Sequence, residues 1–136
     1  MIGDPQVIQV QISLNGLPFQ DVRLTEHELG GYTNVFLGSC QMAGAKVEVN
    51  LAQGRQGNPG RVIVEISQRG LECDRTHALP NKWLDGWSEL AFDIPLPAFT
   101  QFGMEEKVAR SPISVRIKLV RGPYIPRREA VQTATR

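Results

Sequence analysis

Residues 7–16 read VIQVQISLNG, and this stretch decides the class of fold. Apolar residues occupy positions 8, 10, 12 and 14, and polar residues lie between them. Because successive side chains of a strand point to opposite faces, this alternation predicts a strand with one buried face and one solvated face. The pair Asn15-Gly16 follows, and both residue types tolerate the positive φ of a type I′ turn. The stretch therefore predicts a strand that runs directly into a β-hairpin.

The same two-residue period recurs along the rest of the chain. It is found over residues 45–51, 62–67, 90–94 and 114–119, although Ile63 interrupts one polar face, and the apolar residues within 19–24 and the short apolar stretch 32–37 indicate further strands. Turn residues separate these segments, most clearly in the glycine-rich stretch 54–60, and Pro95 and Pro97 end the strand before them. Only two short stretches, 25–29 and 103–110, are compatible with a helical turn or two. The pattern indicates seven or eight short antiparallel strands.

Many short strands at regular spacing favour an all-β fold. We expect an antiparallel β-sandwich, jelly-roll-like, over residues 1–121, with a closed barrel as the second choice. Residues 122–136 form an extended basic C-terminal arm in this interpretation, because Pro123 and Pro126 fix φ and remove two backbone donors. At 136 residues the chain has the size of one domain.

Charge is divided unevenly along the chain. From Lys107 onward there are eight basic residues and one acid, net +7, whereas residues 1–106 hold seven basic residues and thirteen acids, net −6. Such an asymmetry predicts a basic region with an acidic partner. No segment has the composition of a signal peptide or a membrane span, so we expect synthesis in the cytosol and no membrane partner.

The basic region supplies most of the predicted partner-binding residues. Two of them share a strand face and four lie in the arm: Arg116, Lys118, Tyr124, Ile125, Arg127 and Arg128. In the arm the apolar pair would anchor, and the two arginines would reach acidic groups through charge-assisted hydrogen bonds. Nucleic acid is not favoured as the partner, because single-strand binders interleave several aromatic rings with basic residues and only Tyr124 serves here.

Two tryptophans in the long connection 69–86 and just after it complete the predicted site. Trp83 and Trp87 either pack on the core or an interface, or form a stacking platform for sugar rings. The second possibility makes a carbohydrate-binding module the alternative function.

Metal and catalytic sites find little support in the sequence. Cys73 and His77 have a Cys-x3-His spacing, but a zinc site needs a second pair, and only the distant Cys40 and His27 remain. The two cysteines are expected to be reduced, partly buried thiols. No nucleophile or phosphate-binding motif is present. We therefore predict no cofactor and no enzymatic activity, with a site built from His27, His77 or Cys73 as the remaining enzymatic hypothesis.

A compact all-β body with split charge and a terminal arm resembles the small jelly-roll cement, or decoration, proteins of tailed-phage capsids. The resemblance covers the whole chain in character, from the alternating strands at residues 7–120 to the arm at 122–136. It implies a protein that binds the exterior of a capsid in the virion, bridges shell subunits and associates with its own copies as a homo-oligomer. It assigns no role to any single residue.

Overall fold

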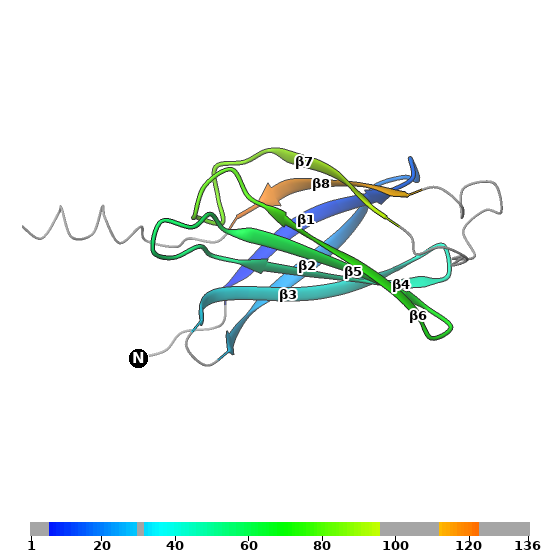
Figure 1. The fold of residues 1–136 in the computed structure, drawn as a ribbon, viewed down its shortest axis with the longest axis horizontal. Helices are drawn as coiled ribbons and strands as arrows, with labels where there is room; N and C mark the ends of the chain where they lie inside the picture. Colours follow the sequence, from blue (N-terminus) through cyan, green and yellow to red (C-terminus); the bar gives the residue numbers. More distant parts are fainter. Residues whose placement is uncertain (1–5, 30–31, 96–111, 123–136) are drawn as a thin grey trace, which may run out of the picture.

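The computed structural model describes residues 6–29, 32–95 and 112–122, and eight strands run through them (Figure 1). The strands are β1 (Val7–Leu14), β2 (Gln20–Leu29), β3 (Tyr32–Met42), β4 (Ala45–Ala52), β5 (Arg61–Gln68), β6 (Leu71–Ala78), β7 (Glu89–Ile94) and β8 (Ile113–Arg121). No helix occurs among the described residues, so the predicted all-β class is confirmed.

The strands form one antiparallel sheet in the order β6-β5-β4-β3-β2-β1-β8-β7. The first six follow one another along the chain, whereas β8 returns to pair with β1 and carries β7 on its other side. The two outermost strands, β6 and β7, approach each other: the rings of His77 and Phe92 stack with centroids 4.8 Å apart. The sheet therefore curls until it is nearly closed, like a barrel (Figure 1).

The finer prediction of a two-sheet, jelly-roll-like sandwich is not confirmed, because one hydrogen-bonded sheet contains all eight strands. Alternating apolar residues specify that a strand has a buried face, but they do not specify its neighbours, so the alternation does not distinguish a sandwich from a barrel. The predicted body at 1–121 holds every described strand. Of the predicted arm, residues 123–136 lie outside the described residues.

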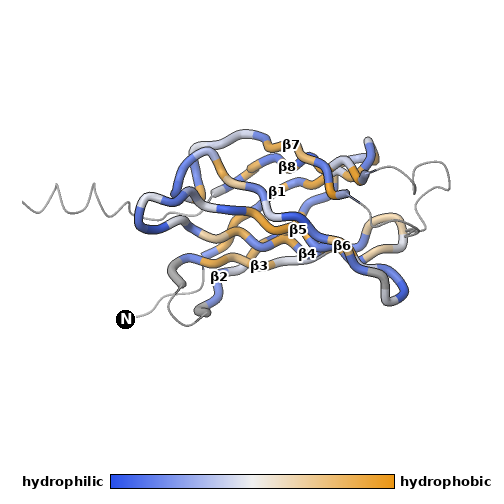
Figure 2. The backbone as a smooth tube through the Cα atoms, viewed as in Figure 1, coloured by the Kyte–Doolittle hydropathy of each residue, from blue (hydrophilic) through white to orange (hydrophobic). Residues whose placement is uncertain are grey.

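The concave face of the sheet carries the core. Apolar side chains with 0% exposure come from both halves of the sheet and include Ile8, Ile12, Leu24, Phe36, Leu51, Val64, Ile66, Ile94 and Ile117. Figure 2 shows apolar and polar positions alternating along several of the strands. Full burial of one such side chain contributes about 1.5–3 kcal/mol, so this filled interior holds the sheet in its curved form.

The first hairpin confirms the prediction made from Asn15-Gly16. Both residues have positive φ, 51° and 76°, as a type I′ turn requires. The turn is also fixed to β8: the Asn15 N–H donates to the Ser114 carbonyl at 2.8 Å, and the Ser114 N–H donates to Asn15 Oδ1 at 2.8 Å. This end of the sheet is therefore pinned by residues far apart in the sequence.

Two local predictions were wrong. Residues 25–29, expected as a helical turn, lie inside β2, because β1 and β3 on either side supply its backbone hydrogen bonds. The long connection expected at 69–86 contains strand β6, which pairs with β5 through a tight turn at Arg69-Gly70 with positive φ at both residues. The short helix expected at 103–110 lies outside the described residues.

Candidate functional site

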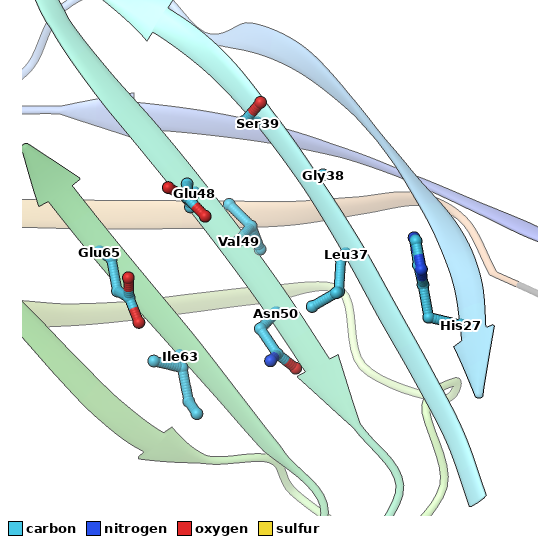
Figure 3. Close-up of a pocket in the computed structure, with 9 residues that line it drawn as sticks. All are labelled: His27, Leu37, Gly38, Ser39, Glu48, Val49, Asn50, Ile63 and Glu65. Atoms are coloured by element: carbon cyan, nitrogen blue, oxygen red, sulfur yellow. The ribbon is translucent and has the colours of Figure 1, made fainter. Parts of the chain in front are cut away.

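An open pocket lies on the outer, convex face of the sheet, over β2, β3, β4 and β5 (Figure 3). Its volume is about 260 Å³. The residues that line it are His27, Leu37, Gly38, Ser39, Glu48, Val49, Asn50, Ile63 and Glu65. Four neighbouring strands thus build one hollow on the side of the sheet that does not carry the core.

Strand register fixes the apolar walls of the pocket. Leu37 on β3 lies opposite Asn50 on β4, and Asn50 lies opposite Ile63 on β5. All three side chains are half-buried. Directly opposite residues of an antiparallel pair have Cβ atoms about 4.5–5.5 Å apart. Leu37 and Ile63 therefore flank Asn50 on both sides.

Asn50 presents an unused acceptor at this place. Its Oδ1 atom is buried and has no hydrogen-bond partner among the described residues. A buried acceptor without a donor costs about 1–3 kcal/mol, and such groups are normally satisfied by protein, water or ligand. The pocket therefore combines apolar walls with one acceptor suited to an N–H donor.

Three carboxylates line up beside the pocket. Glu48 on β4 lies opposite Glu65 on β5, and Glu65 lies opposite Asp74 on β6. A second hollow of about 270 Å³ next to them is also lined by Glu72. We call Glu48, Glu65, Glu72 and Asp74 the acidic face. Like charges directly opposite each other are destabilising, so this arrangement favours a cation between them.

One ion pair moderates the acidic face. The Nζ atom of Lys46 lies 3.3 Å from Glu48 Oε1, and both side chains are about half exposed. An exposed pair of this kind is weak, because solvent and salt screen it. Glu65, Glu72 and Asp74 have no ion pair within the described part of the chain. The acidic face therefore keeps most of its charge.

A glycine on β3 allows the strands beneath the pocket to approach closely. A Cβ atom added to Gly38 would overlap the Arg23 carbonyl oxygen and lie 2.7 Å from Leu24 Cδ2. Real Cβ atoms do not approach other atoms so closely, so a larger residue would push β3 away from β2. Gly38 is therefore required for the local packing of the pocket floor.

A basic face lies on the outer side of β2, β1 and β8, and we define it by Arg23, Arg116, Lys118 and Arg121. Gln9 on β1 lies between Arg23 on β2 and Arg121 on β8, so these two arginines are aligned across the sheet. Lys118 places its Nζ atom 4.1 Å from the centre of the Phe19 ring. A cation over an aromatic face at this distance is attracted by the ring.

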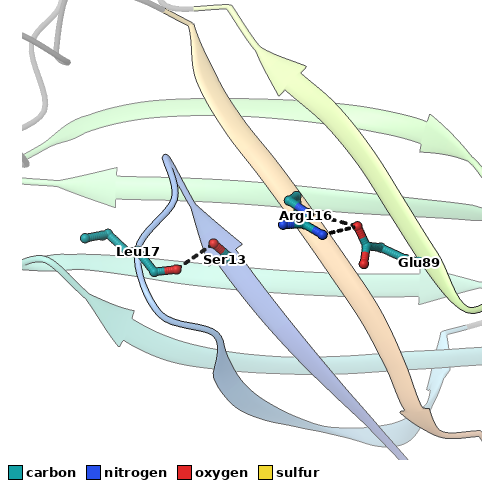
Figure 4. A network of polar contacts seen from close by, with 4 residues as sticks. All are labelled: Ser13, Leu17, Glu89 and Arg116. Atoms are coloured by element: carbon teal, nitrogen blue, oxygen red, sulfur yellow. Dashed lines mark hydrogen bonds and ion pairs between the residues drawn. The ribbon is translucent and has the colours of Figure 1, made fainter.

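Arg116 is held in place by an acid on the neighbouring strand (Figure 4). Its Nε donates to Glu89 Oε2 at 2.9 Å, and its Nη2 lies 2.8 Å from the same oxygen. Nearby, Ser13 Oγ donates to the Leu17 carbonyl at 2.6 Å, and the Leu17 side chain is 37% exposed. The basic face thus combines fixed cations with the partly exposed apolar groups of Leu17 and Phe19.

The middle strands of the two faces, β5 and β1, lie on opposite sides of the nearly closed sheet, and Arg23 on β2 is the cation nearest the acidic face. In the order of the nearly closed sheet, β8 is four strands from β4, which is halfway round. The acidic face covers β4, β5 and β6, and the basic face covers β2, β1 and β8, where Asp21 and Glu89 lie among its cations. Of the basic residues from Lys107 onward, only Arg116, Lys118 and Arg121 belong to the described part of the chain.

Of the predicted site residues, the structure describes Arg116, Lys118, Trp83 and Trp87. Arg116 and Lys118 lie together on the basic face, as their shared strand face predicted. Trp87 is only 6% exposed and packs in the core, so its ring offers no surface for a sugar, and Trp83 is half-buried with Lys82 Nζ 5.4 Å from its ring centre. The predicted residues of the arm, Tyr124, Ile125, Arg127 and Arg128, lie outside the described residues.

The cysteines and histidines do not converge. Cys73 and His77 lie four residues apart on β6, which is about 13 Å along a strand. Burial, with a smaller contribution from the Asp74 charge, raises the pKa of the Cys73 thiol to about 11, and burial also raises the pKa of Cys40. Reactive cysteines need the opposite shift. Both cysteines are free, and no group of metal-binding side chains is found among the described residues.

Sequence reasoning missed the pocket, although one signal pointed to it. Ile63 breaks the polar face of its strand, and the structure shows that this residue forms a pocket wall. An outward apolar residue indicates a pocket wall only where residues of the neighbouring strands flank it. The sequence does not show which strands neighbour β5. Leu37 and Asn50 carried no comparable signal.

Comparisons with protein-family models, with curated proteins and with solved structures find no match to this chain. Within the described ranges, no helix is long and apolar enough to cross a membrane.

Proposed function

We propose that this chain is a structural assembly protein that binds and reinforces a tailed-phage capsid as a cement or decoration protein. Its partners are the subunits of the capsid shell and its own copies, and its place is the exterior of the virion. The observation that carries the proposal is the separation of the basic face and the acidic face onto different strands of the outer surface of one nearly closed sheet. A protein that repeats on a lattice needs two different contact patches of this kind.

The basic face has the chemistry of a docking surface. Residues that dominate binding energies at protein interfaces are often arginine and aromatic side chains that are ordered before the partner arrives. Here the Arg116 guanidinium is ordered by Glu89, and Lys118 and Arg116 lie 4.1 Å and 5.4 Å from the centre of the Phe19 ring. The exposed side chain of Val120, at 53%, adds apolar area on the same strand. This surface suits an acidic protein patch.

Charge separation also suits recruitment to a large shell. A molecule with opposite charge on its two sides is oriented by the field of its partner, which raises the rate of productive encounter. The net charge of +1 means that many copies can gather without strong mutual repulsion. Both properties favour dense, oriented binding on a lattice.

The test is binding to purified capsids from the phage that encodes the chain, after its own copies have been removed. The full chain is added back and co-sedimented, and the double variant Arg116→Glu/Lys118→Glu is compared with Arg61→Glu, an exposed residue on β5 away from the basic face. We expect saturable binding of the full chain, a loss of at least about tenfold for the double variant, and little change for Arg61→Glu.

Three results would count against the proposal in different ways. A full chain that does not bind the capsids contradicts the cement role. Binding that survives the double variant contradicts the assignment to the basic face. Equal loss for Arg61→Glu would show that net charge alone governs binding. Circular dichroism of each variant confirms that the fold is retained.

A further inference from the structure

We infer that the outer-face pocket is the acceptor for a basic side chain from a second copy of this chain, so that copies join with the acidic face of one against the basic face of the next. This inference deepens the self-association named in the proposed function and rests on it, but it does not depend on a capsid. It identifies which surfaces meet and which atoms recognise each other.

The pocket has the three groups that an arginine side chain requires. Glu48 and Glu65 face each other across β4 and β5 and supply carboxylate oxygens for a guanidinium group. Arginine carries five N–H donors in a fixed planar arrangement. If each carboxylate accepts two of them, one N–H remains for a third acceptor. The buried and unpartnered Oδ1 of Asn50, two residues along β4 from Glu48 and on the same face, is that acceptor.

The walls of the pocket fit the remainder of the same side chain. Arginine and lysine bury their aliphatic stems against apolar surface while the charged end reaches polar groups. Leu37 and Ile63 are half-buried on either side of Asn50 and provide such surface. A volume of about 260 Å³ is large enough for one long side chain and too small for a folded segment. The occupant is therefore a single basic residue projecting from a partner surface.

The basic face of a second copy supplies this residue by charge complementarity. Arg116 is engaged by Glu89, and Lys118 lies over Phe19. Arg23 and Arg121 are exposed, outward-facing and without an ion pair in the described part of the chain. These two arginines are aligned through Gln9 and are the side chains available to enter the pocket of a neighbour.

The position of the two faces determines the form of the assembly. Because β8 lies halfway round the sheet from β4, a copy whose pocket is occupied still has Arg121 free. Contacts between two different patches of the same molecule generate rings or open chains, whereas a patch that contacts itself stops at a dimer. The expected products are therefore species larger than dimers at high concentration.

The experiment measures the molar mass of the full chain by sedimentation velocity and light scattering over a range of concentrations, at low and high salt. One variant reverses the pocket acids, Glu48→Arg/Glu65→Arg, and a second reverses the arginines, Arg23→Glu/Arg121→Glu. Each alone should be monomeric where the parent chain associates. An equimolar mixture should associate again, because each variant retains the face that the other has lost.

A third variant separates recognition in the pocket from general charge attraction. Asn50→Leu has nearly the same size and removes the unpartnered acceptor while leaving every charge in place. Replacing a buried, unsatisfied polar group by an apolar one does not lower the stability of the isolated chain. We expect thermal unfolding at or above the parent temperature and association weakened about tenfold, which corresponds to one hydrogen bond to a charged donor.

The outcomes distinguish this inference from the broader proposal. A parent chain that stays monomeric at low salt, a mixture that fails to associate, or an Asn50→Leu variant that associates like the parent overturns the pocket contact. If the capsid binding described above persists in any of these cases, the assembly role remains and only the self-contact is lost. If self-association is intact but capsids are not bound, the self-contact remains and the capsid-binding role is contradicted.

Discussion

The basic face and the acidic face differ in how their charges are compensated. On the side of β8 and β1, Arg116 pairs with Glu89, Lys118 lies over Phe19, and Gln11 Nε2 donates to Asp21 at 3.0 Å. On the side of β4, β5 and β6, carboxylates face carboxylates, and a buried amide oxygen has no donor among the described residues. Both sides rest on the same filled core.

The difference separates what the fold needs from what a partner would add. On the side of β8 and β1, Arg116 and Lys118 already have partners in the isolated chain, whereas Arg23 and Arg121 have no ion pair in the described part of the chain. The side of β4 to β6 holds polar groups in a state that costs free energy, and proteins keep such groups mainly where a partner or ligand offsets the cost. The predictions below probe this contrast, beginning with the change that would disturb the acidic side most.

The largest effect should follow Gly38→Ala, at the floor of the pocket. The added Cβ atom overlaps the backbone of Arg23 and the side chain of Leu24, so β2 and β3 must separate. Overpacking of this kind costs about 1–3 kcal/mol of unfolding free energy, measured by urea denaturation. Gly122→Ala is the control, because its added Cβ would meet only ordinary contacts at 3.7 Å or more. Equal stability of the two variants would contradict the close approach.

The second prediction concerns Cys73, a buried residue of β6 that neighbours Asp74 of the acidic face. Its pKa is raised to about 11 by burial and by the Asp74 charge, so at mildly alkaline pH its thiolate fraction is about a hundredfold below that of an ordinary thiol. Labelling of the native chain should be slow by about that factor relative to the unfolded chain. Asp74→Asn should speed labelling of the native chain modestly. An unchanged labelling rate would contradict a contribution of the Asp74 charge to the Cys73 pKa.

The same shift fixes the sign of the pH dependence of stability. The folded state holds the Cys73 proton more tightly than the unfolded state, whose thiol titrates at its ordinary value of 9.0. The contribution of this group is therefore complete below pH 9 and is lost as pH rises through about 11. Cys73→Ala should show a weaker loss of stability across this interval than the parent chain, in denaturation series at several pH values.

The third effect should be a gain in stability. Glu65 is the middle member of three directly opposed acids, so Glu65→Gln removes two like-charge contacts at nearly constant shape. We expect the isolated chain to become more stable by about 0.5 kcal/mol, with the gain decreasing at high salt. Glu72→Gln, which has no acid directly opposite, is the matched control because its register partner is Ser67. A loss of stability in Glu65→Gln would show that the carboxylate is already compensated.

The contrast between the two faces also shows which features can be predicted from the sequence alone. Alternation at residues 7–14 and the Asn15-Gly16 turn predicted a hairpin that the structure contains, with both turn residues at positive φ. The shared face of Arg116 and Lys118 was likewise predictable, because it depends on one strand alone. The acidic face was not, since it depends on which residues of three strands lie opposite one another, and register is set by the whole sheet.

The smallest effect should be the coupling between Arg116 and Glu89, and it decides how complete the basic side is. The pair has two short contacts to one oxygen, but the side chains are 51% and 32% exposed, so solvent screens it. A double-mutant cycle with Arg116→Ala and Glu89→Ala should give a coupling of about 0.2–0.4 kcal/mol that falls with salt. The role of Glu89 is to orient the guanidinium, and little stability is needed for that. A coupling near zero at low salt would mean that Arg116 moves freely, and the basic side would then be no more ordered than the acidic side.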